Sequence, residues 1–403
     1  CKLSTDYFDF ALQAWVRLAR VLKADYSQYL KKLMPLIFRE CNEESAQGRD
    51  ALESDSGDEY NPSGNVAELE SALSALANVP RDVGVGFYPF LGDAVAVLND
   101  KIDYWGEESV RVYAARAYSA LFSVVCLALK SNLVKANEAL HCLSEFIQKL
   151  LSVFKDESDF AVKKSILTTI SSLLEESPEM GLAYLSQNDN DKNILNTMFG
   201  LIKISAQTSF KIDENLKNEE NDAEEISRYE AIRELETENV YKTAEVFSTV
   251  LKVMGDQAVP TFSAFLDQII NSLTKEDTEQ IVKKAMLLII TDAVLYIPNT
   301  MQKYAEFLFK LYINLLETAD MDIKQTSIYG LGILAEKCNA VVRGKALNLL
   351  KICTNLYTSL KTKEEENASM LRENAASAYG RITFACSKEI NLNDSFPAWL
   401  KML

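Results

Sequence analysis

Residues 323–332, Ile-Lys-Gln-Thr-Ser-Ile-Tyr-Gly-Leu-Gly, decide the fold of this chain. The stretch begins with an aliphatic residue followed by a basic one, and the apolar Leu331 lies eight positions after Ile323. Eight residues are a little over two turns of an α-helix, so Ile323 and Leu331 share one face. Gly332 follows at once, as Gly380 follows Tyr379 later in the chain. Because glycine has no Cβ, we expect both positions to allow an adjacent helix of the same kind to approach closely.

The aliphatic–basic dipeptide recurs along the sequence at intervals of 52, 120, 41 and 48 residues, and the interval of 120 corresponds to two periods with one dipeptide missing. Its occurrences are Val110-Arg111, Val162-Lys163, Val282-Lys283, Ile323-Lys324 and Leu371-Arg372. A helical unit that returns every 40 to 60 residues or so is typical of an α-solenoid of the HEAT type. We therefore predict an all-α, armadillo-type fold: a single HEAT-repeat array of about eight antiparallel helix pairs over residues 1–403.

The apolar periodicity places the pairs, with the first helix of each (A) expected on the convex side and the second (B) on the concave side. Pro80, Pro178 and Pro298 fall at predicted A-to-B turns, where a residue that cannot continue a helix belongs. Trp15 lies on the apolar stripe of the first helix and is expected in the core. The expected pairs are 6–23 with 26–41, 65–79 with 84–100, 107–129 with 133–154, 158–176 with a helix from 192, 237–254 with 258–273, 278–296 with 299–317, 322–337 with 340–359, and a last pair from 364.

Two acidic inserts interrupt this rhythm. Residues 42–64 carry seven acidic residues and one arginine, and residues 213–238 carry eleven acidic residues and three basic ones. Their net charges of −6 and −8 account for nearly all of the chain's −16, so the remaining solenoid is close to neutral. The first insert, rich in Gly, Ser, Pro and Asp, is predicted to be a disordered loop, and the second to be partly helical.

Two interpretations of the acidic inserts remain open. They are either solvated spacers or electrostatic attractants for a basic partner. Under the second interpretation, the carboxylates of residues 213–225 are candidate contacts for a basic partner. Asp267, on the polar face of the predicted helix 258–273, is a further candidate. Trp105, in an expected inter-repeat loop, either touches a partner or packs under its loop. The candidate partner-binding residues are Asp213, Glu214, Glu219, Glu220, Asp222, Glu224, Glu225, Asp267 and Trp105.

The sequence offers no pattern typical of an enzyme. Glycine-rich phosphate loops, nucleophile elbows, HExxH and CxxC are absent, and the only histidine, His141, lies in an apolar helix pattern where a partly buried structural role is expected. Seven scattered cysteines predict reduced thiols, with Cys126, Cys338 and Cys353 in the core. We expect no catalytic residues, metal or cofactor. A pI near 4.8 argues against nucleic acid, and the lack of an 18-residue apolar run argues against a membrane.

Five tracts, in order, resemble importin-β family receptors of the importin-5 (karyopherin-β3) type. Leu12–Leu18 is similar to that family's "LQAWARM" helix, and Gly106–Ala117 to its "DGVRVAAAES" helix. Ile328–Ala335 resembles its YGLG-type helix. The final two tracts are Glu364–Ile382, similar to "EN..SA.GKI", and Phe396–Leu400, similar to "LP.WL". An acidic stretch lies between the second and third tracts, as in that family.

The resemblance implies a nuclear transport receptor, of which this chain matches the C-terminal half. Such receptors bind basic cargo proteins, contact Phe-Gly nucleoporins, release cargo to Ran-GTP and shuttle between cytoplasm and nucleus. The principal Ran-binding repeats and main basic-signal pocket are implied to lie upstream. The alternative is a HEAT-repeat scaffold subunit, of the phosphatase regulatory or chromosome-structure type. We also interpret the chain, which does not open with methionine, as a piece of a longer protein.

Overall fold

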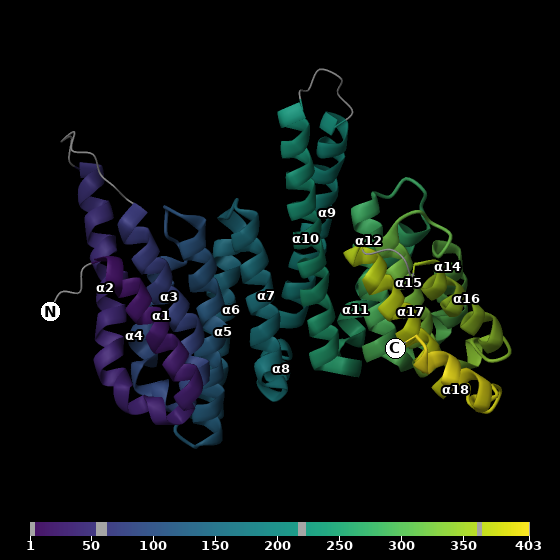
Figure 1. Cartoon of the computed structure of the whole chain (residues 1–403), viewed down its shortest axis with the longest axis horizontal. Helices are drawn as coiled ribbons and strands as arrows, with labels where there is room; N and C mark the ends of the chain where they lie inside the picture. The colour runs from purple at the N-terminus through teal and green to yellow at the C-terminus, as the bar shows by residue number, and fades with distance from the viewer. Residues whose placement is uncertain (1–4, 54–62, 217–222, 361–364, 403) are drawn as a thin grey trace. The chain divides into compact units, whose positions relative to one another are not determined.

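The computed structural model describes residues 5–53, 63–216, 223–360 and 365–402, leaving aside the side chains of 5–9, 43–53 and 63–65. Every regular element in these ranges is a helix (Figure 1). The chain divides into two compact units. The first runs to Asn190 and includes Glu234–Lys242, and the second comprises Asp191–Arg233 and Thr243 onwards, so α10 contributes to both.

The first unit alternates long A helices with B helices. The A helices α1, α3, α5 and α7 pack on one another in chain order, α2 packs on α4, and α6 packs on α8. Short 3-10 segments, Lys23–Tyr26 and Gly84–Phe90, lead into α2 and α4. The helices are α1 (Thr5–Leu22), α2 (Ser27–Glu53), α3 (Ser63–Val83), α4 (Leu91–Lys101), α5 (Glu108–Lys130), α6 (Ala136–Asp156), α7 (Phe160–Glu176) and α8 (Pro178–Leu185).

The second unit repeats the plan, with α12, α15 and α17 packed in order as A helices. Three further 3-10 segments, Gly255–Ala258, Gln302–Tyr304 and Asn339–Val341, lie in the turns. The helices are α9 (Asn190–Leu216), α10 (Ala223–Met254), α11 (Val259–Thr274), α12 (Gln280–Tyr296), α13 (Pro298–Met301), α14 (Ala305–Leu315), α15 (Met321–Lys337), α16 (Ala346–Ser359), α17 (Glu366–Ala385) and α18 (Leu392–Leu400). The predicted all-α solenoid of helix pairs is confirmed.

The predicted turn signals are correct at two of three prolines. Pro178 and Pro298 each begin the helix after the turn, where the missing N–H costs no hydrogen bond. Pro80 instead lies inside the last turn of α3, which ends at Val83. Gly84 follows with a φ of +68°, a left-handed conformation that terminates helices and that glycine adopts without strain.

The two glycines that follow the apolar residue of the repeat serve different neighbours. A Cβ on Gly332 would lie 3.0 Å from the Cα of Ala378, so this glycine brings α15 close to α17, as expected. A Cβ on Gly380 would lie 2.8 Å from the ring of Trp399, which belongs to α18. The expectation that Gly380 faces the next A helix is therefore wrong, because the bulky indole occupies that space.

Three other expectations need correction or refinement. Residues 42–53, assigned to a disordered loop, continue α2, because helix formers such as Glu44, Ala46 and Gln47 outweigh the single Gly48. Residues 54–62 lie outside the described residues. Within 213–238, all described residues are helical. Trp15 is half-buried, since α1 turns Leu12 and Ala19 inward instead.

Helix α5 is an apolar and largely buried A helix. It is long and apolar enough to cross a membrane, but 67% of its apolar window is buried inside the protein, as in a core helix. Cys126, within α5, is buried, as are Cys338 and Cys353, which confirms their predicted core positions. Burial raises the pKa of the Cys126 thiol to about 12, so this cysteine stays protonated and unreactive at neutral pH.

Candidate partner-binding surfaces

Helices α9 and α10 carry most of the candidate carboxylates. They lie side by side as a helical hairpin (Figure 1), with Arg233 of α10 placed 3.7 Å from Asp213 of α9. With 27 and 32 residues they exceed the 17 residues of α12 by at least ten. At 1.5 Å per residue, this extra length amounts to about 15 Å of helix.

The carboxylates at the far end of the hairpin are mostly open to solvent. Glu214, Glu224 and Glu225 are exposed, whereas the Asp213 side chain is 39% exposed beside Arg233. Both members of that ion pair are well hydrated, so the pair itself adds little to stability. The remaining candidates of this segment, Glu219, Glu220 and Asp222, lie outside the described residues.

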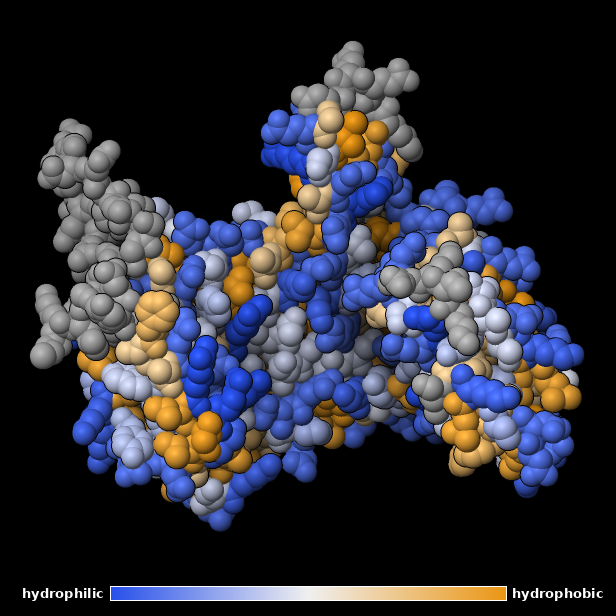
Figure 2. Space-filling model, in the orientation of Figure 1, coloured by the Kyte–Doolittle hydropathy of each residue, from blue (hydrophilic) through white to orange (hydrophobic). Residues whose placement is uncertain are grey.

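Apolar surface accompanies these charges. Phe210 is 52% exposed and lines a shallow surface hollow of about 480 Å³. The hollow is also lined by Gln207, Lys211, Glu214 and Glu279, the residue that precedes α12. Figure 2 shows hydrophobic and hydrophilic residues side by side on the hairpin. A surface of this mixed kind suits a partner that carries both basic and apolar side chains.

Asp267 is exposed on α11 but lies away from the far end of the hairpin. Its neighbour Gln268 accepts a hydrogen bond of 3.1 Å from Lys203 of α9. Lys203 precedes Asp213 by ten residues, which is about 15 Å along a helix. The structure therefore does not bring Asp267 into the same cluster as Asp213 and Glu214.

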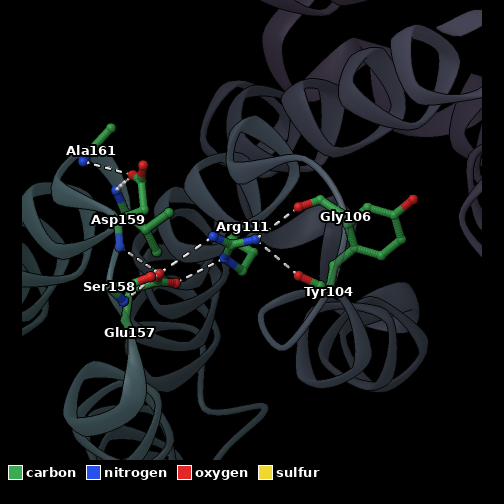
Figure 3. Close-up of polar contacts among 8 residues, drawn as sticks. Tyr104, Gly106, Arg111, Glu157, Ser158, Asp159 and Ala161 are labelled. Carbon is green, nitrogen blue, oxygen red and sulfur yellow. Dashed lines mark hydrogen bonds and ion pairs between the residues drawn. The ribbon is translucent and has the colours of Figure 1, made fainter.

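Trp105, in the loop between α4 and α5, is 70% exposed. The alternative in which it packs under its loop is wrong, because a buried cation holds the loop instead. The Arg111 guanidinium donates to the carbonyl oxygens of Tyr104 (3.0 Å) and Gly106 (3.1 Å), the residues on either side of the tryptophan (Figure 3). The backbone of the loop is thus fixed without using the indole.

The other edge of the guanidinium meets Glu157. Nε of Arg111 lies 2.8 Å from Oε2 and Nη2 lies 3.3 Å from Oε1, a bidentate arrangement (Figure 3). Glu157 also accepts from the backbone N–H groups of Ser158 (2.9 Å) and Asp159 (2.8 Å). Asp159 in turn caps α7 by accepting from Ala161 at 2.8 Å. We call this arrangement the Arg111 clamp: Arg111, its partner Glu157, and the carbonyl oxygens of Tyr104 and Gly106 to which Arg111 donates.

The electrostatics of the clamp favour its ionised form. Burial raises the pKa of Glu157, but the hydrogen bonds from Arg111 and from the two backbone N–H groups outweigh burial, and the pKa lies below its ordinary value. The side chains of Arg111 and Glu157 are only 15% and 6% exposed. Sequence reasoning missed this clamp, although the recurring dipeptide contains Arg111 and an aspartate at the N-cap of α7 marks the start of a helix.

Beside the Trp105 loop, α4 and α6 enclose a groove of about 570 Å³. Lys149 of α6 lines the groove and pairs with Asp103 of the loop. The remaining lining residues are Val95, Asn99, Glu145, Phe146, Gln148 and Ser152.

The described residues show no arrangement that favours metal chemistry. No group of three or more His, Cys, Asp or Glu side chains in the described ranges is placed to hold a metal ion. His141 is exposed and lies 3.4 Å from Glu145, one turn along α6. The expected partly buried role of His141 is wrong, because this position faces away from the apolar stripe formed by Leu143, Phe146 and Ile147.

Comparison with known proteins gives a consistent result, although no protein-family model matches the chain. The sequence is 23% identical over 417 aligned residues to a protein described as a probable importin-5 homolog from Dictyostelium discoideum. That alignment covers 98% of this chain and 37% of the relative. This chain therefore spans little more than a third of the length of that relative.

Solved structures of the karyopherin Kap121p share the fold. A mutant of Kap121p matches with a TM-score of 0.71 at 16% identity, covering all of this chain and 37% of that one. Kap121p bound to Pho4p matches with a TM-score of 0.67 at 17% identity, and Kap121p bound to Nup53p with 0.65 at 17%. Both of these matches cover 97% of this chain and 36% of the karyopherin.

Proposed function

We propose that this chain, which resembles importin-β family receptors of the importin-5 type along its whole length, is the cargo-carrying part of a nuclear import receptor. The resemblance predicted from the five sequence tracts is confirmed by the importin-5 homolog, and the fold by Kap121p. Karyopherin structures with Pho4p and with Nup53p support a role in holding other proteins. We place the chain in the C-terminal half of its receptor because of the order of the tracts.

One observation on the chain itself supports this proposal in addition to the similarity in sequence and fold. It is the acidic end of the α9–α10 hairpin. Glu214, Glu224 and Glu225 are exposed there, and the whole segment 213–238 has a net charge of −8. Concentrated negative charge on a projecting element attracts basic proteins over a distance of about one Debye length, roughly 8 Å at physiological ionic strength. We therefore propose basic proteins as the cargo.

The remaining parts of the cycle follow from the same proposal. Ran-GTP releases the cargo, mainly through repeats outside this chain, and Phe-Gly nucleoporins carry the receptor through the pore. The receptor accordingly shuttles between cytoplasm and nucleus. No catalytic step is required of the chain, because binding and release alone move the cargo.

The test is to neutralise the acidic segment in the full-length receptor. Changing Glu219, Glu220, Asp222, Glu224 and Glu225 to Gln or Asn removes five negative charges. Association with an arginine- and lysine-rich cargo is then followed by stopped-flow fluorescence at low and at high salt. We expect association at low salt to slow by about tenfold, with a smaller effect at high salt, because steering acts mainly on the association rate.

A matched control removes five negative charges elsewhere, at Asp50, Glu53, Asp55, Asp58 and Glu59 of the first acidic insert. This variant has the same net charge and should associate at nearly the wild-type rate. Equal slowing in both variants would mean that only total charge matters. Unchanged rates in the first variant would show that the segment is a solvated spacer. Stable co-purification with a catalytic subunit would favour the scaffold alternative.

A further inference from the structure

We infer that Trp105 and the carboxylates around it form a second contact for the basic cargo, in which an arginine or lysine side chain stacks on the indole. This inference rests on the proposed function, since it specifies how one part of a basic cargo is held. It concerns the first unit alone and does not depend on the α9–α10 hairpin.

The fold does not need the indole of Trp105. The ring is 70% exposed, and the loop backbone is held by the Arg111 clamp through the carbonyls of Tyr104 and Gly106. Exposure alone does not mark a contact site, since Phe384 is 84% exposed as well. Trp105 combines exposure with a backbone held in place and with neighbouring carboxylates, and tryptophan is enriched at binding hot spots. The clamp thus presents the indole to solvent in a defined place.

The base of the loop limits the motion of the ring. The rings of Tyr104 and Trp105 lie 6.1 Å apart with an interplanar angle of 35°, and Lys101 lies 5.6 Å from the Tyr104 ring. A Cβ on Gly106 would lie 2.6 Å from the Tyr104 ring, so only glycine lets that ring pack on the loop. Binding to a preorganised loop costs less conformational entropy than ordering a flexible one.

The charges around the indole specify the chemistry of the partner. Asp103, Glu107 and Glu108 are exposed carboxylates within three residues of Trp105. The cations near the loop are engaged, because Lys101 pairs with Asp100, Lys149 with Asp103 and Arg111 with Glu157. A cation above the indole face therefore gains both a cation–π interaction and attraction to carboxylates, whereas an acidic partner is repelled.

The groove between α4 and α6 offers room for the residues next to that cation. It connects to the loop through the Lys149–Asp103 pair and is lined by apolar Val95 and Phe146 and by polar Asn99 and Glu145. A volume of about 570 Å³ accommodates one or two side chains of an extended segment. The groove therefore suits a basic segment of the cargo whose arginine side chain stacks on the indole of Trp105.

The experiment measures binding of a fluorescent peptide of alternating arginine and glycine to the full chain by anisotropy, at low salt. Trp105→Ala should weaken binding by about tenfold, and Trp105→Phe by less, because phenylalanine keeps a weaker cation–π surface. The control is Phe384→Ala, which removes an 84% exposed aromatic ring whose neighbours Thr383 and Ala385 are uncharged. This control should bind like the wild type.

Charge neutralisation adds a second readout. Glu107→Gln combined with Glu108→Gln should weaken binding at low salt, and the difference should shrink at high salt as screening increases. Wild-type affinity in Trp105→Ala overturns the inference. If the hairpin variant still slows cargo association in that case, the proposed function stands without this site. If neither variant changes binding of the basic probes, both proposals fail.

Discussion

The close contact between α15 and α17 predicts a large effect at Gly332. A Cβ there would lie 3.0 Å from the Cα and 3.2 Å from the Cβ of Ala378, and 3.2 Å from Cδ of Arg381. The arginine can swing aside, but the Ala378 backbone can move only if α17 shifts. Gly332→Leu places four more carbons in this gap and should force the two helices apart.

The change in the free energy of unfolding at Gly332 follows from two opposing contributions. Replacing glycine inside a helix stabilises it by about 1 kcal/mol through the smaller entropy of the unfolded chain. Overpacking a close-packed interface costs about 1–3 kcal/mol, and more for a large side chain. We expect Gly332→Ala to be nearly neutral or destabilised by up to about 2 kcal/mol, and Gly332→Leu to be destabilised by about 3 kcal/mol.

Gly200 supplies the matched control, since a Cβ at this position in α9 meets nothing within 4 Å. Gly200→Ala should raise stability by up to about 1 kcal/mol. Urea unfolding is followed by circular dichroism and by tryptophan fluorescence, because Trp399 packs against α17 and reports on this part of the second unit. If Gly332→Leu is as stable as Gly200→Ala, α15 and α17 do not pack through Gly332.

Two further changes test buried polar contacts. Arg111→Met leaves the buried Glu157 without its cation and should destabilise the first unit by about 3 kcal/mol at pH 7 in urea unfolding. Since the folded pKa of Glu157 is depressed, the wild-type gain is present at neutral pH and lost as pH falls through that pKa; the variant, which keeps only the backbone hydrogen bonds from Ser158 and Asp159, should show a weaker acid dependence. Thr291 donates to the carbonyl of Leu287, so the buried Tyr312 hydroxyl, 2.7 Å from Thr291, must be the donor of that pair. Thr291→Val leaves the buried Tyr312 hydroxyl without an acceptor and should lower the free energy of unfolding by about 1–3 kcal/mol, which is more than Tyr312→Phe should. Equal losses of stability in thermal unfolding would contradict the assignment of Tyr312 as the donor.

The repeat and its helices could be predicted because they depend on local signals. The dipeptide at Ile323 and the glycine at Gly332 fix which face of α15 is apolar, and Pro178 and Pro298 mark helix starts. Periodicity states which residues share a face, but it does not state what covers that face. For this reason Trp15 was expected in the core, although α1 buries Leu12 and Ala19 more completely.

The site was harder to predict because it depends on contacts between distant residues. Arg111 and Glu157 are separated by 46 positions, so nothing in the local sequence pairs them. Without that contact the sequence does not reveal that Trp105 is exposed, and it favours burial of the indole under the loop. His141 was misjudged in the same way, since one step around α6 moves a side chain by about 100° from core to solvent.

The most direct test of the proposed import function is nuclear import in permeabilised cells by the full-length protein that contains this chain. The cargo is a fluorescent protein fused to an arginine- and lysine-rich segment, and a fusion with glutamine at the same positions is its control. We predict receptor-dependent nuclear accumulation of the basic cargo alone, slowed when the five carboxylates of the acidic segment are neutralised. Equal accumulation with and without the receptor would contradict the account.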